Sequence, residues 1–178
     1  IRDLRAALDR AADPRLRKTQ IIVRPHPANA AIYETLALRD TVILPRGGAS
    51  PDPGAGLQFL YDCVFHSAAA TGVYTSAMMD AVIVGCSVVA LRIAEYRQTQ
   101  EDAQYFRALA QSGAIALAQS LDDFCGRFAG LLDGRDPEAE ARGRFPDEYI
   151  WPAGDRRPAA EVAADELERV AGIKSFLP

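Results

Sequence analysis

The stretch that decides the fold is AATGVYTSAMMDAVIVGCSVVALRI, residues 69–93, near the middle of the chain. Its first part, Ala69–Tyr74, predicts a short strand. Ser76–Val84 follows with the pattern of a helix, and Gly85 stands where a helix commonly stops. Ser87–Ile93 is a β-branched run that predicts a buried strand. A strand, a helix and a second strand in this order are typical of α/β proteins with a parallel sheet.

The same alternation continues on both sides of this unit. We expect further strands at 20–24, 41–44 and 114–118, and helices at 4–12, 30–38, 57–65, 101–111, 121–132 and 158–170. Residues 20–132 thus give about five β-α units, the usual size of one Rossmann-like half. The predicted fold class is α/β, with a Rossmann-like parallel sheet and helices on both faces. We predict a domain at 1–133, and at 134–178 an exposed connection and a C-terminal helix that packs back on the domain or on a missing N-terminal domain.

Composition narrows the function classes. The chain has 178 residues and a net charge of −4, so general nucleic-acid binding, which relies on clustered basic residues, is not expected. The two histidines and three widely spaced cysteines predict no metal site and a reducing compartment. No signal pattern is present, and the longest apolar stretch, Ala81–Leu91, is far shorter than the roughly 20 residues of a transmembrane helix. We expect a cytoplasmic protein, with peripheral association at the inner face of the membrane left open; a first residue that is not methionine suggests a fragment.

The first chemical motif is Arg24-Pro25-His26-Pro27, directly after the first predicted strand. The prolines lack N–H donors and end the strand ladder, and the residue before a proline is held in extended geometry. His26 is therefore expected at the carboxyl edge of the sheet, where ligands of open α/β sheets bind and where an imidazole serves a phosphate. We predict His26 as a catalytic residue and Arg24 as a substrate-binding one. A histidine that only caps a loop is the alternative.

The second motif begins the helix of the central unit. Thr75 and Ser76 stand where backbone N–H groups and the helix dipole favour an anion. Asp80 lies four residues after Ser76 on the same helical face, and its carboxylate can accept hydrogen bonds from ribose hydroxyls. We predict all three as substrate-binding residues. Ordinary N-capping by Thr75 and Ser76, and a solvated Asp80, remain the alternatives.

Two loops at the same predicted edge supply weaker candidates. Arg46 precedes Gly47-Gly48 after the second strand and is predicted to clamp a phosphate or an acidic sugar. Gln100 closes the polar segment after Ser87–Ile93 and is predicted to line a sugar pocket. A flexible surface loop and a plain connecting loop are the respective alternatives.

Two of these segments resemble a known family. RPHP at 24–27 and TSAMMDAVIVGCSVVAL at 75–91 are similar to the C-terminal, donor-nucleotide domain of GT-B fold bacterial glycosyltransferases. That family's pattern of a serine, an acidic residue, a glycine and a buried strand corresponds here to Ser76, Asp80, Gly85 and Val88–Leu91. The His-Pro pair resembles that of bacterial sialyltransferases, Kdo transferases and CDP-glycerol glycerophosphotransferases. The longer stretch 21–121 looks like surface-polysaccharide glycosyltransferases.

The resemblance implies roles and partners. His26, Thr75 and Ser76 would contact the donor phosphate, and Asp80 the ribose; many family members have glutamate where this chain has Asp80. The chain would be one half of a GT-B fold, binding a nucleotide-sugar or CDP-activated donor without metal or cofactor. The glycan or lipid-linked acceptor would be bound by the missing N-terminal domain, so the isolated chain would be inactive. A CDP-glycerol glycerophosphotransferase, a sugar-nucleotide 2-epimerase and a non-catalytic binding module are the alternative functions.

Overall fold

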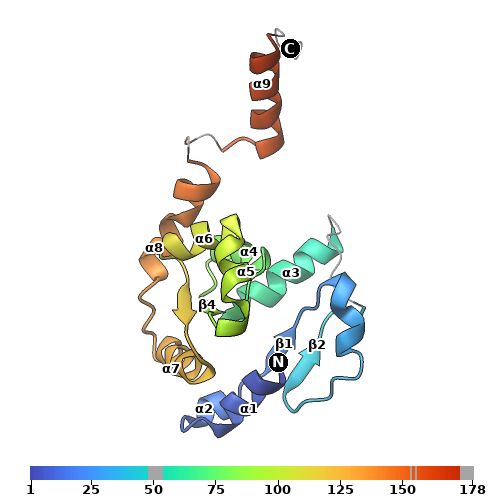
Figure 1. Cartoon of the computed structure of the whole chain (residues 1–178), viewed down its shortest axis with the longest axis vertical. Coiled ribbons are helices and arrows are strands. Elements are labelled where there is room, and N and C mark those ends of the chain that lie inside the picture. The colour runs from blue at the N-terminus through green and yellow to red at the C-terminus, as the bar shows by residue number, and fades with distance from the viewer. Residues whose placement is uncertain (48–53, 153, 155, 173–178) are drawn as a thin grey trace. The chain divides into compact units, whose positions relative to one another are not determined.

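The computed structural model describes residues 1–47, 54–152, 154 and 156–172 (Figure 1). The chain divides into two compact units, Ile1–Phe145 and Pro146–Pro178. The first unit contains the strands and the predicted site residues. This division lies beyond the domain boundary at residue 133 that was predicted from the sequence.

The strands of the first unit are all parallel and form two sheets. β3 (Ala70–Gly72), β4 (Val88–Leu91) and β5 (Ala116–Ala118) make a three-stranded sheet in that order. β1 (Ile21–Val23) pairs only with β2 (Thr41–Ile43) within the described chain, so the five strands do not share one hydrogen-bonded ladder. The predicted mixed α/β class with parallel strands is confirmed.

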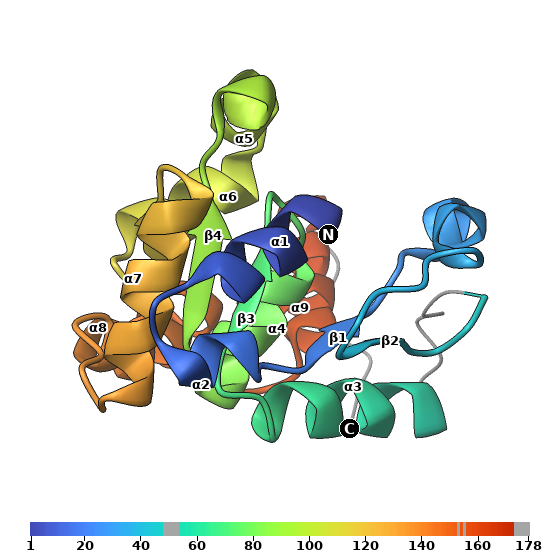
Figure 2. The ribbon, with the colours of Figure 1, turned by 90° about the horizontal axis from the view of Figure 1, so that it is seen from below.

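The two sheets nevertheless lie in the order of a single one. Figure 2 shows β4, β3, β1 and β2 from left to right. The unpaired edge of β1 therefore faces the unpaired edge of β3. The interruption between these two strands is the main feature that the sequence pattern did not predict.

Most predicted helices are present. Those of the first unit are α1 (Arg2–Arg10), α2 (Pro14–Arg17), α3 (Ala55–Phe65), α4 (Ala77–Val84), α5 (Arg97–Asp102), α6 (Gln104–Gln111), α7 (Leu121–Leu132) and α8 (Ala139–Phe145). The helix expected at 30–38 is instead a 3₁₀ helix, η1 (Pro27–Tyr33), and the one expected at 101–111 is divided at Ala103. No helix in the described part of the chain has the length and apolar character needed to cross a membrane.

Helices cover both faces of the three-stranded sheet. α7 packs on β4 and β5 and contacts α1, and Val89 of β4 points into that layer. Thr71 of β3 is paired with Val89 and shares its face of the sheet. Successive residues of a strand point to opposite faces, so Gly72 belongs to the other face. A Cβ atom at Gly72 would stand 3.0 Å from Met78 of α4, which places α4 on that second face.

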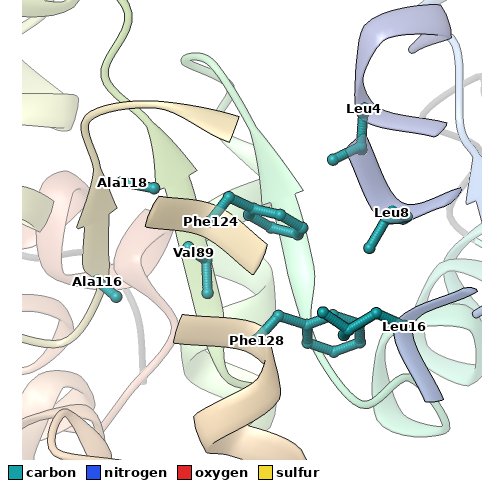
Figure 3. Packing of buried hydrophobic residues seen from close by; sticks show 8 residues of the cluster. All are labelled: Leu4, Leu8, Leu16, Val89, Ala116, Ala118, Phe124 and Phe128. Carbon is teal, nitrogen blue, oxygen red and sulfur yellow. The ribbon is translucent and has the colours of Figure 1, made fainter. Parts of the chain in front are cut away.

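The principal core lies between α7 and the N-terminal helices. Phe124 and Phe128 are buried and stacked, with ring centroids 5.9 Å apart. They point toward Leu4 and Leu8 of α1 and Leu16 of α2 (Figure 3). This packing attaches α1 and α2 to the three-stranded sheet, and the chain leads directly from α2 into β1.

Arg5 fixes the segment between α2 and β1. Its side chain is buried, and Nη1 donates to the Thr19 carbonyl at 2.6 Å. Nη2 makes longer contacts with the carbonyls of Leu16 and Arg17 and an ion pair with Asp9 at 2.8 Å. A buried guanidinium needs such partners because an unpaired charge in the interior is costly. Arg5 therefore sets where β1 begins.

The stretch 133–144, expected as an exposed connection, contains α8 and is partly buried. Arg142 is buried, donates to the Gly85 carbonyl at 3.2 Å and forms an ion pair with Asp136. Asp136 also accepts from Ser87 at 2.6 Å. These bonds attach α8 to the end of α4 and the start of β4. Most of the stretch is exposed, and the pair of buried Arg142 and half-buried Asp136 is its exception.

The second unit contains a π-helical turn at Pro146–Ile150 and α9 (Ala159–Ala171). A helix was predicted from the sequence only at 158–170, the position of α9. Arg157 pairs with Asp165 at 2.7 Å, and Arg156 lies over the Trp151 ring. α9 exposes the apolar side chains of Leu167 and Val170.

Candidate functional site

Arg24 follows β1 and is half-buried. Its Nη1 lies 3.5 Å from Cys63 Sγ on α3, and its guanidinium lies 5.0 Å from the centre of the Phe59 ring. Within the described chain no carboxylate forms an ion pair with it, unlike the buried Arg5 and Arg142. A half-buried guanidinium without an anionic partner is suited to bind an anion from solution.

His26 is exposed and begins η1. Its Nδ1 accepts a hydrogen bond from the Ala28 N–H at 3.1 Å. The capping role considered as the alternative is therefore present. Because Nδ1 acts as the acceptor, the neutral ring carries its proton on Nε2, which can donate to a ligand. Capping thus orients the imidazole and leaves its second nitrogen for binding.

The start of α4 is only weakly capped by its own side chains. Ser76 is the N-cap residue, but its hydroxyl makes no capping hydrogen bond. Thr75 Oγ1 lies 3.4 Å from the Ala77 N–H, at the long end of the hydrogen-bond range. Both side chains are exposed. The Met78 and Met79 N–H groups donate to the carbonyls of Thr75 and Ser76, so the hydroxyls and the weakly bonded Ala77 N–H are the donors left for an anion. The alternative of ordinary capping by Ser76 is not observed.

Asp80 lies in the first turn of α4 and is exposed. Desolvation by the surrounding protein raises the pKa of its carboxyl group. Lost hydration disfavours the charged carboxylate, which is why the pKa rises. The site therefore holds an acidic group that would gain from a hydrogen-bond donor.

The two halves of the candidate site meet at one cavity. A cavity of about 750 Å³ lies between β1 and β3, and both Arg24 and Thr75 line it. His26 and Ser76 follow these two residues in the chain but do not line the cavity. Its apolar lining side chains come from the four helices α1, α3, α4 and α7 and from β1: Leu4, Leu8, Ile21, Ile22, Leu60, Val64, Met78, Phe124, Phe128 and Leu132.

A group of tyrosines lies at the same ends of the strands. The neighbouring Glu95 raises the pKa of Tyr96, and the phenols of Tyr74 and Tyr33 add to this rise. Tyr33 ends η1, and Tyr74 precedes α4. Burial and the nearby Tyr74 raise the pKa of Tyr105. No role was assigned to these rings from the sequence, although Tyr74 ends the strand predicted at 69–74 and Tyr96 follows the strand predicted at 87–93.

Gln100 and Arg46 do not join this arrangement. Gln100 is fully buried, and its Nε2 donates to the carbonyls of Val73 and Leu91 at 2.7 and 2.8 Å. It joins the ends of β3 and β4, so the predicted contact with substrate is replaced by a structural role. Arg46 is exposed and does not line the cavity. The loop that it begins continues into residues 48–53, outside the described part of the chain. No cluster of three metal-ligating side chains occurs among the described residues.

Replacing Gln100 tests its structural role. Gln100→Leu leaves two buried carbonyls without a donor, which costs about 1–3 kcal/mol for each unpaired buried group. We expect a clear loss in the free energy of unfolding, measured by urea denaturation. Gln98→Leu, at an exposed position of the same helix, is the control and should change stability little. Equal stability of the two variants would contradict the assignment.

The raised pKa of Asp80 predicts a dependence on pH. Its folded pKa lies above the unfolded value, so the penalty for the charged carboxylate appears as pH rises from 3.8 through the folded pKa and is complete above it. Asp80→Asn removes this penalty. We expect the variant to be more stable than the unmodified chain at neutral pH, with the difference shrinking in acid. A variant that is less stable at neutral pH would show that the carboxylate makes favourable contacts in the folded state.

No protein-family model, curated protein or solved structure matches the chain. The resemblance to GT-B glycosyltransferases remains a prediction from the two motifs.

Proposed function

We propose that this chain is the donor-nucleotide-binding half of a glycosyltransferase that moves a sugar from a nucleotide-activated donor to a surface-glycan acceptor. The observation that carries the proposal is the shared cavity. It places Arg24, after β1, and Thr75, before α4, on one concave surface. Ligand sites of α/β proteins form at such strand ends.

The phosphates of the donor would bind between these two segments. The N-terminus of α4 offers the weakly bonded Ala77 N–H, the hydroxyl of Ser76 and the positive end of the helix dipole. Arg24 adds a guanidinium that lacks an ion pair within the described chain. His26 adds Nε2, since its Nδ1 is occupied by the Ala28 N–H. These donors suit a diphosphate and neutralise part of its charge without a metal ion.

The rest of the nucleotide has candidate partners nearby. Asp80, one turn into α4, would accept hydrogen bonds from ribose hydroxyls, which would compensate the carboxylate for lost hydration. The rings of Tyr74 and Tyr96 would offer stacking surfaces to the base, because aromatic rings stack on every nucleobase.

In the transfer step, the bond between the anomeric carbon and the donor phosphate breaks, and an acceptor hydroxyl oxygen forms the new bond to that carbon. The electron pair of the broken bond stays on the phosphate oxygen. Donors at the α4 N-terminus and on His26 would stabilise this growing charge, which is where preorganised dipoles accelerate reactions most. The acceptor, and the base that takes its proton, would be held by an N-terminal domain, and the reaction would occur in the cytoplasm at the membrane's inner face.

Calorimetry with nucleotides tests the proposal directly. The chain is titrated with CMP, CDP, UDP and GDP, and we expect at least one to bind. His26→Ala and Ser76→Ala should each weaken the binding of that nucleotide by about 1 kcal/mol or more, because each removes a donor to a charged group. CDP-glycerol, compared with sugar nucleotides, then separates glycerophosphate transfer from sugar transfer.

The control is Gln111→Ala. Gln111 is exposed at the C-terminal end of α6 and does not line the cavity, so its loss should leave nucleotide binding unchanged. If none of the four nucleotides binds, or if Gln111→Ala weakens binding as much as His26→Ala does, the proposed site is wrong.

A further inference from the structure

The cavity between β1 and β3 has the surroundings of a sheet interior. It is lined by Leu8 of α1 and Phe124 of α7, and also by Val64 of α3 and Met78 of α4. Ile22 on β1 faces the cavity and is 43% exposed. Apolar surfaces of these helices therefore already line the gap, while β1 and β3 themselves are not paired.

The main-chain groups at the gap are the right ones for pairing. The Ile21 N–H donates to Asp40 at 2.8 Å, and the Val23 carbonyl accepts from Leu44 at 2.9 Å, so both residues face the β2 side. Because successive residues of a strand direct these groups to alternate sides, Ile22 presents its N–H and carbonyl to the gap.

The same alternation holds on the other edge. The Ala70 N–H donates to Ser87 at 2.8 Å and so faces the β4 side. Thr71, the next residue, presents its N–H and carbonyl to the gap. Within the described chain, neither Ile22 nor Thr71 has a main-chain hydrogen-bond partner there.

The side-chain faces restrict how the two strands can pair. Ile21 and Ala69 both pack against the core formed by α1 and α7, so they belong on one face of a joint sheet. A one-residue slip would reverse the faces. The nearest allowed parallel registers therefore place Val23 or Ile21 opposite Thr71.

What fills the gap must supply backbone-like donors and acceptors. An apolar ligand would cover the side chains but leave the strand edges unpaired, and each buried unpaired main-chain group is costly. Direct pairing of β1 with β3 satisfies both edges and removes Ile22 from water. It needs no additional partner.

We infer that β1 and β3 pair in a closed state of this domain, joining the two sheets into one five-stranded sheet in the order β2-β1-β3-β4-β5. With Val23 opposite Thr71, His26 lies level with Tyr74, and with Ile21 opposite Thr71 it lies level with Ser76. Closure thus assembles the two halves of the anion site. This second consequence, that nucleotide favours closure, rests on the proposed function; the pairing itself does not.

Disulfide trapping tests the pairing and its register. Ile21→Cys/Thr71→Cys and Val23→Cys/Thr71→Cys place thiols on one face in the two registers. Ile22→Cys/Thr71→Cys places them on opposite faces and is the matched control. All carry Cys63→Ser, because Cys63 also lines the cavity. One same-face pair should link at least about tenfold faster than the control, since a disulfide forms only between side chains that point toward each other.

Amide hydrogen exchange on the unmodified chain gives a second measurement that needs no substitution. The Ile21 N–H is bonded to Asp40, so it is the internal reference for its neighbour. Pairing protects Ile22 as well, and we expect its exchange to slow toward that of Ile21, most strongly with nucleotide bound.

The outcomes separate the two proposals. Same-face linking above the control without nucleotide supports the pairing. Two results together overturn the pairing, both with and without CDP or UDP. The same-face pairs link no faster than the control, and the Ile22 amide exchanges rapidly while the Ile21 amide is protected. If the pair links and calorimetry detects no nucleotide, the pairing stands and the proposed function fails.

Discussion

The packing of Phe124 and Phe128 against the first two helices is the contact on which the rest of the domain depends. These rings on α7 hold Leu4, Leu8 and Leu16 against the three-stranded sheet (Figure 3). β1 has no hydrogen bond to β3, so its place beside that sheet is set through α1 and α2. Aromatic side chains contribute much of a core's burial energy, which suits them to this role.

This arrangement explains why the candidate site is divided. Arg24 and His26 follow β1, whereas Thr75 and Ser76 lie between β3 and α4. Side-chain packing joins the two parts, and the cavity lies between them. A ligand that binds both parts would gain affinity in the arrangement that brings them together, and would therefore shift the population toward it. Binding and closure are then one coupled equilibrium.

Local patterns in the sequence predicted the elements that local physics decides. Gly85 ends α4 in the left-handed conformation, with φ of 90°, and Ser120 caps α7 by accepting from the Asp123 N–H. The interruption of the sheet was not predictable in this way, because strand pairing depends on partners distant in the sequence. Gln100 was misassigned for a similar reason. A polar residue near a strand end has the same sequence signature whether it meets a ligand or, as here, two backbone carbonyls.

In the proposed site one anion is held by both sides of the gap. Nuclear magnetic resonance during a nucleotide titration can follow the His26 ring and the Ser76 and Ala77 amides in one experiment. All three signals should shift along the same saturation curve, because one ligand contacts both segments. Shifts confined at saturation to the His26 side or to the α4 side would show that no single anion bridges the gap.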